Sequence, residues 1–279
     1  MNALRQARTF TVGGRQLGGA RPFVFAGPCV LENPALTRSI AERLLEITGE
    51  RGVDLVFKAS FDKANRTKAD SARGPGIEGG LEQLARVRED LGVPTLTDVH
   101  LPEQCALAAP AVDVLQIPAF LCRQTDLLVA AGESGRAVNV KKGQFLAPWD
   151  MAHAVGKVRA GGGDSVSVCE RGTTFGYGRL VVDMSGFVDL AALGVPVVFD
   201  ATHSVQRPGG ADGTTGGNRD LAPLLARAAA ATGEVDGFFF EVHPHPESSP
   251  SDGANMLRLE EFPAILDGVL AVWRAARGG

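Results

Sequence analysis

The sequence is poor in the residues that mark several classes of protein. Its 279 residues include only four cysteines, two tryptophans and one tyrosine, and its net charge is −4. Four cysteines in a chain this long do not make a disulfide framework, so we expect a reducing compartment. The small negative charge and the lack of an aromatic platform give no indication of a nucleic acid or an anionic membrane as partner.

Several segments that would define other architectures are also missing. No apolar stretch is long enough to span a bilayer, and the first twenty residues lack the apolar core of a signal peptide. Gly27-Pro28-Cys29 stands where an open dinucleotide-binding sheet would carry G-x-G-x-x-G. With 44% hydrophobic residues the chain can still bury a sizeable core. We therefore expect a soluble, cytoplasmic protein.

Apolar runs and helical segments alternate along the chain. Eight short runs are predicted as strands, at residues 23–26, 55–57, 95–97, 114–117, 137–140, 166–169, 197–199 and 238–240. Helical spacing is found at residues 34–50, 76–91, 102–109, 123–131, 149–160, 186–193, 221–232 and 259–276. This alternation predicts a parallel sheet with right-handed crossovers, and eight units can close into a (β/α)8, or TIM, barrel. An open doubly wound sheet is the alternative.

The chain is predicted as one barrel domain over residues 1–279, with a hairpin extension in residues 1–20. The hairpin is indicated by residues 9–12 and 15–17 on either side of Gly13-Gly14. Four long polar loops follow predicted strands, at residues 60–75, 171–184, 204–219 and 244–254. They should lie on one face, and residues 204–219, rich in Gly, Thr and Asp, are predicted to form a mobile lid.

Most of the apolar runs end on a polar or ionisable residue, which is typical of a barrel with its active site at the carboxyl ends of the strands. One set is basic: Lys58, Lys63, Arg66, Lys141, Lys142 and Arg171. Cations that follow buried strands in an acidic protein predict a site for phosphate or carboxylate groups. Two clusters of cations would suit two anionic substrates, although a single phosphosugar would also fit.

Two further sets of residues lie at the same predicted mouth. Uncharged or acidic groups that could form hydrogen bonds or shuttle protons are Asn65, Asp98, His100, Gln116, Gln144 and Asp200. A thiol, an imidazole and two carboxylates suit a divalent ion such as Zn2+ or Fe2+, and these are Cys29, His203, Glu241 and Asp252. Their spacing alone is a weak signal, because a free cysteine is more often a small buried hydrophobe. That reading is preferred for Cys105, Cys122 and Cys169.

Long motifs in the chain resemble the 3-deoxy-D-manno-octulosonate 8-phosphate synthase family. They include Ala26-Gly27-Pro28-Cys29, Lys63-Ala64-Asn65-Arg66-Thr67, Gln116-Ile117-Pro118-Ala119-Phe120-Leu121, Asn139-Val140-Lys141-Lys142-Gly143-Gln144-Phe145 and Phe199-Asp200-Ala201-Thr202-His203. The resemblance covers residues 20–270. It implies a barrel enzyme that condenses phosphoenolpyruvate with D-arabinose 5-phosphate for lipopolysaccharide synthesis, and that is a homotetramer.

The resemblance also implies a role for individual residues. Those expected to bind phosphoenolpyruvate are Lys63, Gln116, Lys141, Gln144 and Arg171, and those expected to hold the pentose phosphate are Lys58, Asn65, Arg66 and Thr67. Arg123 is expected to reach the pentose phosphate of a neighbouring subunit. The implied metal ligands are Cys29, His203, Glu241 and Asp252, for Zn2+, Fe2+ or Mn2+. For the mechanism, Lys58 and His203 are candidates to deliver protons, although His203 is occupied if it is a metal ligand. Cys29 and Asp252 are also predicted as catalytic residues.

Two positions bear on how the family pattern applies. The family has metal-dependent and metal-independent branches, with Cys or Asn after Ala-Gly-Pro, so Cys29 implies metal dependence. His245 stands where Asp or Asn is more usual, and we expect it to be exposed. The sister enzyme that uses erythrose 4-phosphate carries Lys-Pro-Arg-Thr where this chain has Lys63-Ala64-Asn65-Arg66-Thr67. That enzyme, and a non-catalytic barrel that binds a metal or a phosphosugar, remain the alternatives.

Overall fold

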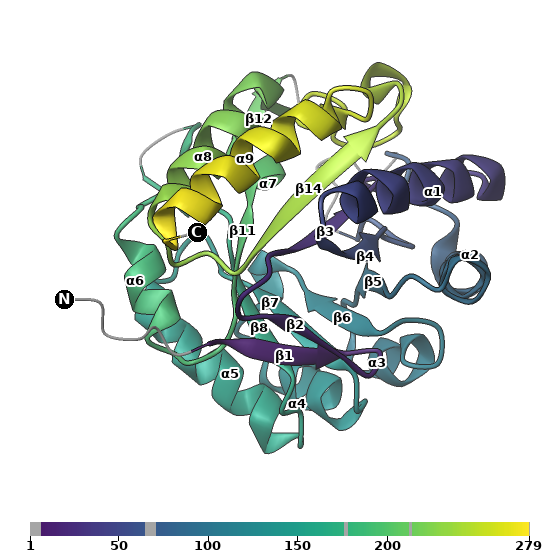
Figure 1. The fold of residues 1–279 in the computed structure, drawn as a ribbon. Coiled ribbons are helices and arrows are strands. Elements are labelled where there is room, and N and C mark those ends of the chain that lie inside the picture. The colour runs from purple at the N-terminus through teal and green to yellow at the C-terminus, as the bar shows by residue number, and fades with distance from the viewer. Residues whose placement is uncertain (1–6, 65–70, 176–177, 212–213, 279) are drawn as a thin grey trace.

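The fold is a closed barrel of parallel strands, seen in a computed structural model that describes residues 7–64, 71–175, 178–211 and 214–278. The barrel strands are β3 (Phe23–Gly27), β4 (Asp54–Lys58), β5 (Thr95–Asp98), β6 (Val114–Ile117), β7 (Ala137–Lys141), β8 (Val166–Glu170), β11 (Val197–Asp200) and β14 (Gly237–His243). Each pairs in parallel with the next, and β14 pairs with both β3 and β11, which closes the ring (Figure 1). The predicted (β/α)8 barrel is confirmed.

A ring of helices surrounds the strands (Figure 1). These are α1 (Pro34–Glu50), α2 (Gly76–Leu91), α3 (Pro102–Ala108), α4 (Thr125–Glu133), α5 (Met151–Ala160), α6 (Gly186–Ala191), α8 (Ala222–Ala231) and α9 (Phe262–Ala276). Local sequence fixes where they begin: the Asn33 side chain accepts a hydrogen bond from the Leu36 amide, and Pro34 occupies the first turn of α1. None of the helices in the described ranges is both long and apolar enough to cross a membrane.

Strand residues alternate between two hydrophobic clusters. Val24 and Ala26 of β3 pack outward against the helices, while Phe23 and Phe25 fill the inside of the barrel. The inward position nearest the carboxyl end is polar in most strands, as in Lys58, Asp98, Gln116, Lys141, Asp200 and Glu241. An apolar interior therefore supports a polar layer at one end of the barrel.

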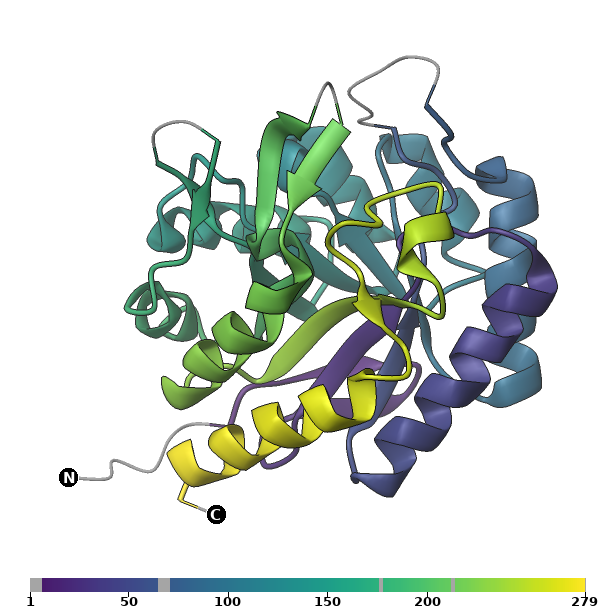
Figure 2. The ribbon, with the colours of Figure 1, turned by 90° about the horizontal axis from the view of Figure 1, so that it is seen from above.

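The predicted N-terminal hairpin covers the opposite end. Strands β1 (Thr9–Val12) and β2 (Arg15–Gly18) pair antiparallel around Gly13 and Gly14, whose φ angles of 54° and 77° favour glycine. The Phe10 ring lies 5.3 Å from that of Phe23, so the hairpin closes the apolar interior (Figures 1 and 2). Arg8 Nε donates to Asp236 Oδ2 over 2.8 Å and ties the chain before β1 to the barrel.

Short elements that the sequence did not predict surround the polar end. They are α7 (Ala201–Ser204), β9 (Thr173–Thr174), β10 (Leu180–Val181), β12 (Gln206–Ala211), β13 (Thr214–Gly217), β15 (Leu257–Arg258), and the 3-10 turns η1 (Ala119–Leu121), η2 (Pro148–Asp150), η3 (Arg219–Leu221) and η4 (Pro246–Ser248). The segment predicted as a lid, residues 204–219, is largely the hairpin β12–β13, which stands at the end opposite to β1–β2 (Figure 2).

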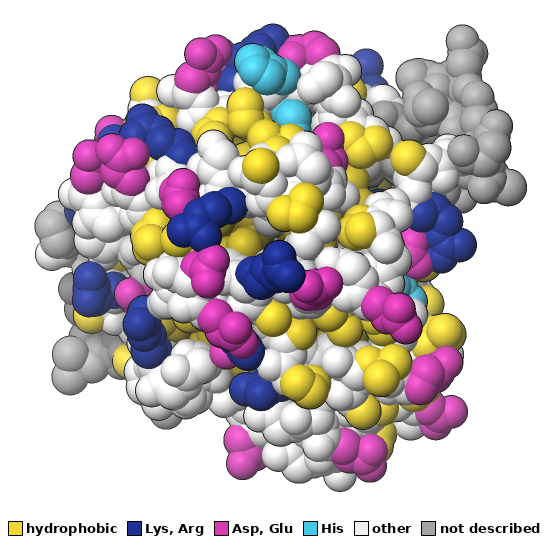
Figure 3. Space-filling view, turned by 90° about the vertical axis from the view of Figure 1, so that its right-hand side faces the viewer, with side chains coloured by type: hydrophobic (Ala, Val, Ile, Leu, Met, Phe, Trp, Pro, Cys, Tyr) yellow, Lys and Arg dark blue, Asp and Glu magenta, His cyan; other side chains and the backbone are white. Residues whose placement is uncertain are grey.

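The outer face that carries α1 and α2 mixes charges of both signs (Figure 3). Arg38 of α1 bonds to Glu42 of its own helix over 2.8 Å and to Asp90 of α2 over 2.6 Å. Exposed pairs of this kind contribute little to stability, but they leave no large patch of one sign on this face. Lys58 and Lys141, by contrast, are buried inside the barrel.

Candidate active site

Three lysines meet at the carboxyl end of the barrel. Lys58 Nζ lies 2.5 Å from Glu241 Oε1, and Lys141 Nζ lies 2.6 Å from Asp200 Oδ2. Lys63 Nζ donates to Ser60 Oγ over 3.0 Å and lies 3.8 Å from Glu241 Oε1. Cations as little exposed as these persist because carboxylates compensate them, and together they bring three ammonium groups to one end of the barrel.

Lys142 does not belong to this group, although the sequence placed it in the basic set. Neighbouring strand residues point to opposite faces, so Lys142 turns away from Lys141. Its Nζ lies 3.5 Å from Glu170 Oε2 and donates to the carbonyls of Gly143 and Leu146. Lys142 therefore supports the backbone that carries Gln144.

An aromatic ring forms the floor beneath two of the lysines. Lys141 Nζ lies 4.0 Å, and Lys58 Nζ 5.3 Å, from the centroid of the fully buried Phe239 ring. The π face attracts a cation without taking a hydrogen-bond donor from it. The ammonium groups are thus held in place while keeping donors for an anionic ligand.

Arg171 and Gln144 are buried at the mouth, and each carries an atom without a partner in the described part of the chain. These atoms are Arg171 Nη1 and Gln144 Oε1. The other guanidinium nitrogen, Arg171 Nη2, donates to Gln206 Oε1. A buried polar atom without a hydrogen bond is costly, so the arrangement indicates a place for a polar ligand.

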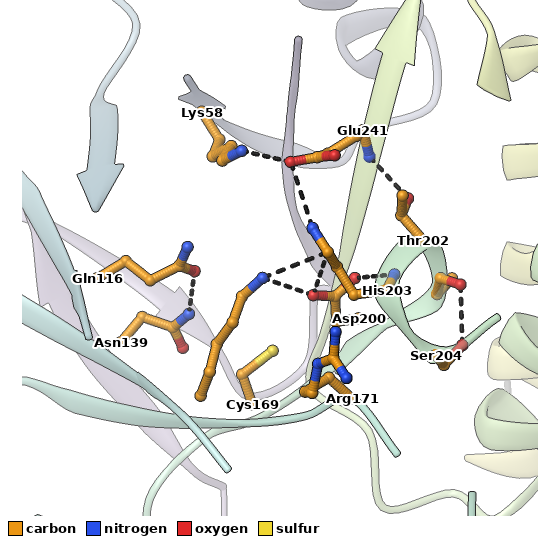
Figure 4. Close-up of polar contacts among 12 residues, drawn as sticks. Lys58, Gln116, Asn139, Cys169, Arg171, Asp200, Thr202, His203, Ser204 and Glu241 are labelled. Carbon is orange, nitrogen blue, oxygen red and sulfur yellow. Dashed lines mark hydrogen bonds and ion pairs between the residues drawn. The ribbon is translucent and has the colours of Figure 1, made fainter. Parts of the chain in front are cut away.

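The short helix α7 sets the position of His203. The Asp200 carboxylate caps α7 by accepting from the His203 amide over 2.9 Å, and its Oδ2 lies 2.7 Å from the ring atom Nδ1 (Figure 4). Because a carboxylate only accepts, the Nδ1–H group donates to Asp200, and Nε2 is the ring atom on the other side. Nε2 faces Glu241 Oε1 at 3.6 Å and Asp252 Oδ2 at 3.7 Å.

Ligand atoms suited to a metal ion gather beside Nε2 of His203. Single atoms of Cys29, Glu241 and Asp252 lie within 4.8 Å of one another. Glu241 Oε2 is buried and has no partner among the described groups. Sulfur, imidazole nitrogen and two carboxylates fit a divalent transition ion such as Zn2+ or Fe2+, and an Asp200–His203 bond is the usual support for such a ligand.

Burial and neighbouring charges shift the ionisation of these groups. Burial, together with Glu241, raises the pKa of the Cys29 thiol to about 12, and the thiol donates to Ser251 Oγ over 3.0 Å. Burial opposes ionisation of Asp98 and Glu241 too, but nearby lysines hold the pKa of both carboxyls well below the usual range. His203 and Lys141 do the same for the pKa of Asp200.

Polar residues that the sequence did not single out support the site. Asn139 lies two positions before Lys141 on the same face of β7, and its Nδ2 donates to Gln116 Oε1 over 2.8 Å (Figure 4). His243 Nε2 lies 3.0 Å from Glu32 Oε1, while its Nδ1 accepts from the His245 amide over 3.0 Å. Period-two alternation could have found Asn139, whereas the Glu32–His243 contact joins distant segments.

Some predicted site residues are not brought into this cluster. Asn65, Arg66 and Thr67 lie outside the described residues. Arg123 is exposed after η1 and lines a cavity of about 380 Å³ with Cys122, Leu146, Asp150, His153, Ala154 and Lys157, which are not residues of the mouth. His245 is exposed, as predicted, and Cys105, Cys122 and Cys169 are buried free thiols.

The fold and the site together define a class: a TIM barrel whose mouth gathers buried cations beside a group of side chains of the metal-ligand type. The chain belongs to the DAHP synthetase I family, whose profile matches residues 9–271. It is 55% identical over 266 residues to a protein of Citrifermentans bemidjiense, covering 95% of this chain and 97% of that one. It is 57% identical over 256 residues to one of Methylobacterium radiotolerans, covering 91% and 90%.

Both relatives carry the same name, 2-dehydro-3-deoxyphosphooctonate aldolase. So does a protein of Desulfatibacillum aliphaticivorans, 55% identical over 270 residues, which are 96% of this chain and 98% of that one. The resemblance predicted from the motifs is confirmed. The comparisons concern whole chains, and the roles of individual residues stay predictions.

Proposed function

We propose that this protein condenses phosphoenolpyruvate with D-arabinose 5-phosphate and water, giving 3-deoxy-D-manno-octulosonate 8-phosphate and inorganic phosphate. The observation that carries the proposal is the 55% identity, along 95% of the chain, to a relative named for the octulosonate phosphate. The buried lysines and Arg171 at the mouth are consistent with two phosphorylated substrates. The product would serve lipopolysaccharide synthesis in the cytoplasm.

The mouth offers distinct groups to the two substrates. Lys63, Lys141 and Arg171 would neutralise the phosphate and carboxylate of phosphoenolpyruvate, with Gln116 and Gln144 as neutral partners. The unpaired donor Arg171 Nη1 supports this assignment. Lys58, together with Asn65, Arg66 and Thr67, would hold the pentose phosphate, with Arg123 of a neighbouring subunit.

The metal-type group would hold one divalent ion, Zn2+, Fe2+ or Mn2+. Cys29, His203, Glu241 and Asp252 would be its ligands, since their donor atoms face one another. When bound, the ion would supply Lewis-acid chemistry, polarising an aldehyde or lowering the pKa of a water molecule. It would also favour ionisation of the buried Cys29 thiol.

The reaction needs a new carbon–carbon bond and the loss of phosphate. C3 of phosphoenolpyruvate attacks the aldehyde of the open-chain pentose, water adds at C2, and phosphate then leaves from C2. Lys141 and Arg171 would hold the enolpyruvyl group against the aldehyde. This lowers the entropic part of the activation barrier, because the two reactants are already oriented. Lys58 Nζ, beside Glu241, would give a proton to the oxygen formed from the aldehyde.

Incubation of the purified protein with both substrates tests the proposal. We expect one phosphate released for each eight-carbon phosphosugar formed, identified by its mass. Binding of phosphoenolpyruvate without phosphate release would favour the non-catalytic barrel. The sister reaction, with erythrose 4-phosphate as acceptor, is the remaining alternative within the same family.

A further inference from the structure

A row of hydrogen bonds crosses four neighbouring strands just inside the mouth. Asp98 is the register partner of Gln116, Gln116 of Asn139, and Asn139 of Ser167. Gln116 Nε2 lies 2.5 Å from Asp98 Oδ1, Asn139 Nδ2 lies 2.8 Å from Gln116 Oε1, and Ser167 Oγ lies 2.9 Å from Asn139 Oδ1. On the other side, Ser60 Oγ donates to Asp98 Oδ2 over 2.9 Å.

The direction of every bond in this row follows from the charge on Asp98. Despite burial, Lys58, Lys63 and Lys141 keep the pKa of Asp98 low, so its carboxylate only accepts hydrogen bonds. Gln116 must therefore turn its NH2 group to Asp98 and its oxygen to Asn139. Asn139 in turn must donate to that oxygen, which leaves its own oxygen for the Ser167 hydroxyl.

This order decides what Gln116 can offer to a ligand. Its oxygen is occupied by Asn139, and one of its two N–H groups is used by Asp98. The second N–H is therefore the donor that Gln116 can offer to a substrate. A flipped amide would instead point its oxygen at Asp98, where two acceptors repel each other. An N–H is the polarity that a phosphate or carboxylate requires.

We propose that Asn139 and Ser167 are positioning residues, which hold Gln116 as a hydrogen-bond donor toward phosphoenolpyruvate. The inference rests on the proposed function, which assigns Gln116 to that substrate. Both positioning residues are fully buried (0% exposed) and act through Gln116, one and two strands away. Changing either residue is expected to weaken the binding of phosphoenolpyruvate more than that of the pentose phosphate.

Asn139→Asp is the decisive variant, because it keeps the shape of the side chain. Its ionised carboxylate cannot donate to Gln116, so kcat/KM for phosphoenolpyruvate should fall on the order of tenfold at pH 8. A protonated carboxyl can donate as the amide did. The deficit relative to the unchanged protein should therefore shrink as the pH is lowered toward 6. The kcat/KM of the variant is divided by that of the unchanged protein at each pH, with saturating metal, which removes effects common to both proteins.

Thr97→Val is a matched control for the loss of a buried polar group. Thr97 precedes Asp98 on β5, is buried, and its Oγ1 has no partner within the described ranges. The kcat/KM of Thr97→Val for phosphoenolpyruvate, divided by that of the unchanged protein, should not depend on pH. Asn139→Leu removes the donor permanently, so its deficit should be the same at every pH.

The proposal is overturned if the Asn139→Asp deficit is independent of pH, or if the KM for arabinose 5-phosphate rises as much as that for phosphoenolpyruvate. Should that variant not fold, Ser167→Ala is the second test, with a smaller rise in the KM for phosphoenolpyruvate expected. An unchanged KM there would also count against the proposal. Calorimetry can compare the affinity of the variant and of the unchanged protein for phosphoenolpyruvate without turnover. A protein that binds phosphoenolpyruvate but does not release phosphate would count against the proposed function. Equal affinities of the two proteins would count against the positioning role.

Discussion

At the scale of single residues, Cys29 carries the clearest consequence. Its sulfur lies near Asp252 and Glu241, and a thiolate binds Zn2+ or Fe2+ far better than an amide does. Cys29→Ala is expected to lose most of its bound metal and most of its activity. Cys29→Asn should keep partial activity that no longer responds to a chelator. Elemental analysis and turnover before and after chelation measure both, and chelator-sensitive Cys29→Asn would contradict the assignment.

Asp98 is expected to make stability depend on pH. Nearby lysines lower the pKa of this carboxyl in the folded state, while the unfolded value is about 3.9. Its stabilising contribution is therefore present above about pH 4 and is lost as the pH falls below that value. Between about pH 5 and 3, the unfolding free energy should fall less steeply in metal-stripped Asp98→Asn than in the metal-stripped parent. Urea unfolding at each pH measures the slopes, and equal slopes would contradict this account.

The residues of the candidate site could be predicted from the sequence where they belong to a recognisable motif. The predicted metal-type set was Cys29, His203, Glu241 and Asp252. Three of these gather within 4.8 Å of one another, and His203 Nε2 lies 3.6 Å from Glu241 and 3.7 Å from Asp252. The Asn139–Ser167 contact was not predicted, because it depends on the register between β7 and β8, which no local pattern specifies. The opposed directions of Lys141 and Lys142 could have been predicted from strand alternation alone.

At the scale of elements, the N-terminal hairpin is expected to stabilise the barrel without taking part in the chemistry. Phe10 is buried (3% exposed) against Phe23 and Phe25, at the end away from the mouth. Phe10→Ala should lower the unfolding free energy by about 3–5 kcal/mol through cavity formation. The kcat of the folded protein should not change. Exposed Thr9→Ala is the control, with a change below about 0.5 kcal/mol.

Barrel strands and helices were predictable because buried parallel strands form short apolar runs and helices repeat at 3.6 residues. Helix α1 begins and ends at the predicted residues, 34 and 50. The hairpin β12–β13 was missed because its segment is rich in Gly, Thr and Asp, which predicts a loop. Helix α7 has only four residues, so it shows no period.

At the scale of the whole molecule, we predict a homo-oligomer, a tetramer by family resemblance. Arg123 lies outside the mouth cluster, and Phe120 beside it is 60% exposed. If Arg123 completes a neighbour's site, Arg123→Ala and Lys141→Ala chains should complement each other. Mixed oligomers would contain sites with both residues intact, and their activity should exceed the sum of the two variants. Activity equal to that sum, or a fully active monomer in sedimentation, would contradict the prediction.

The measurement that tests the account most directly is the choice of acceptor by one metal-loaded sample. The steady-state release of phosphate from phosphoenolpyruvate should be followed with arabinose 5-phosphate and, separately, with erythrose 4-phosphate. The account predicts a clearly higher kcat/KM with arabinose 5-phosphate. A comparable or higher value with erythrose 4-phosphate would contradict it and assign the protein to the sister reaction.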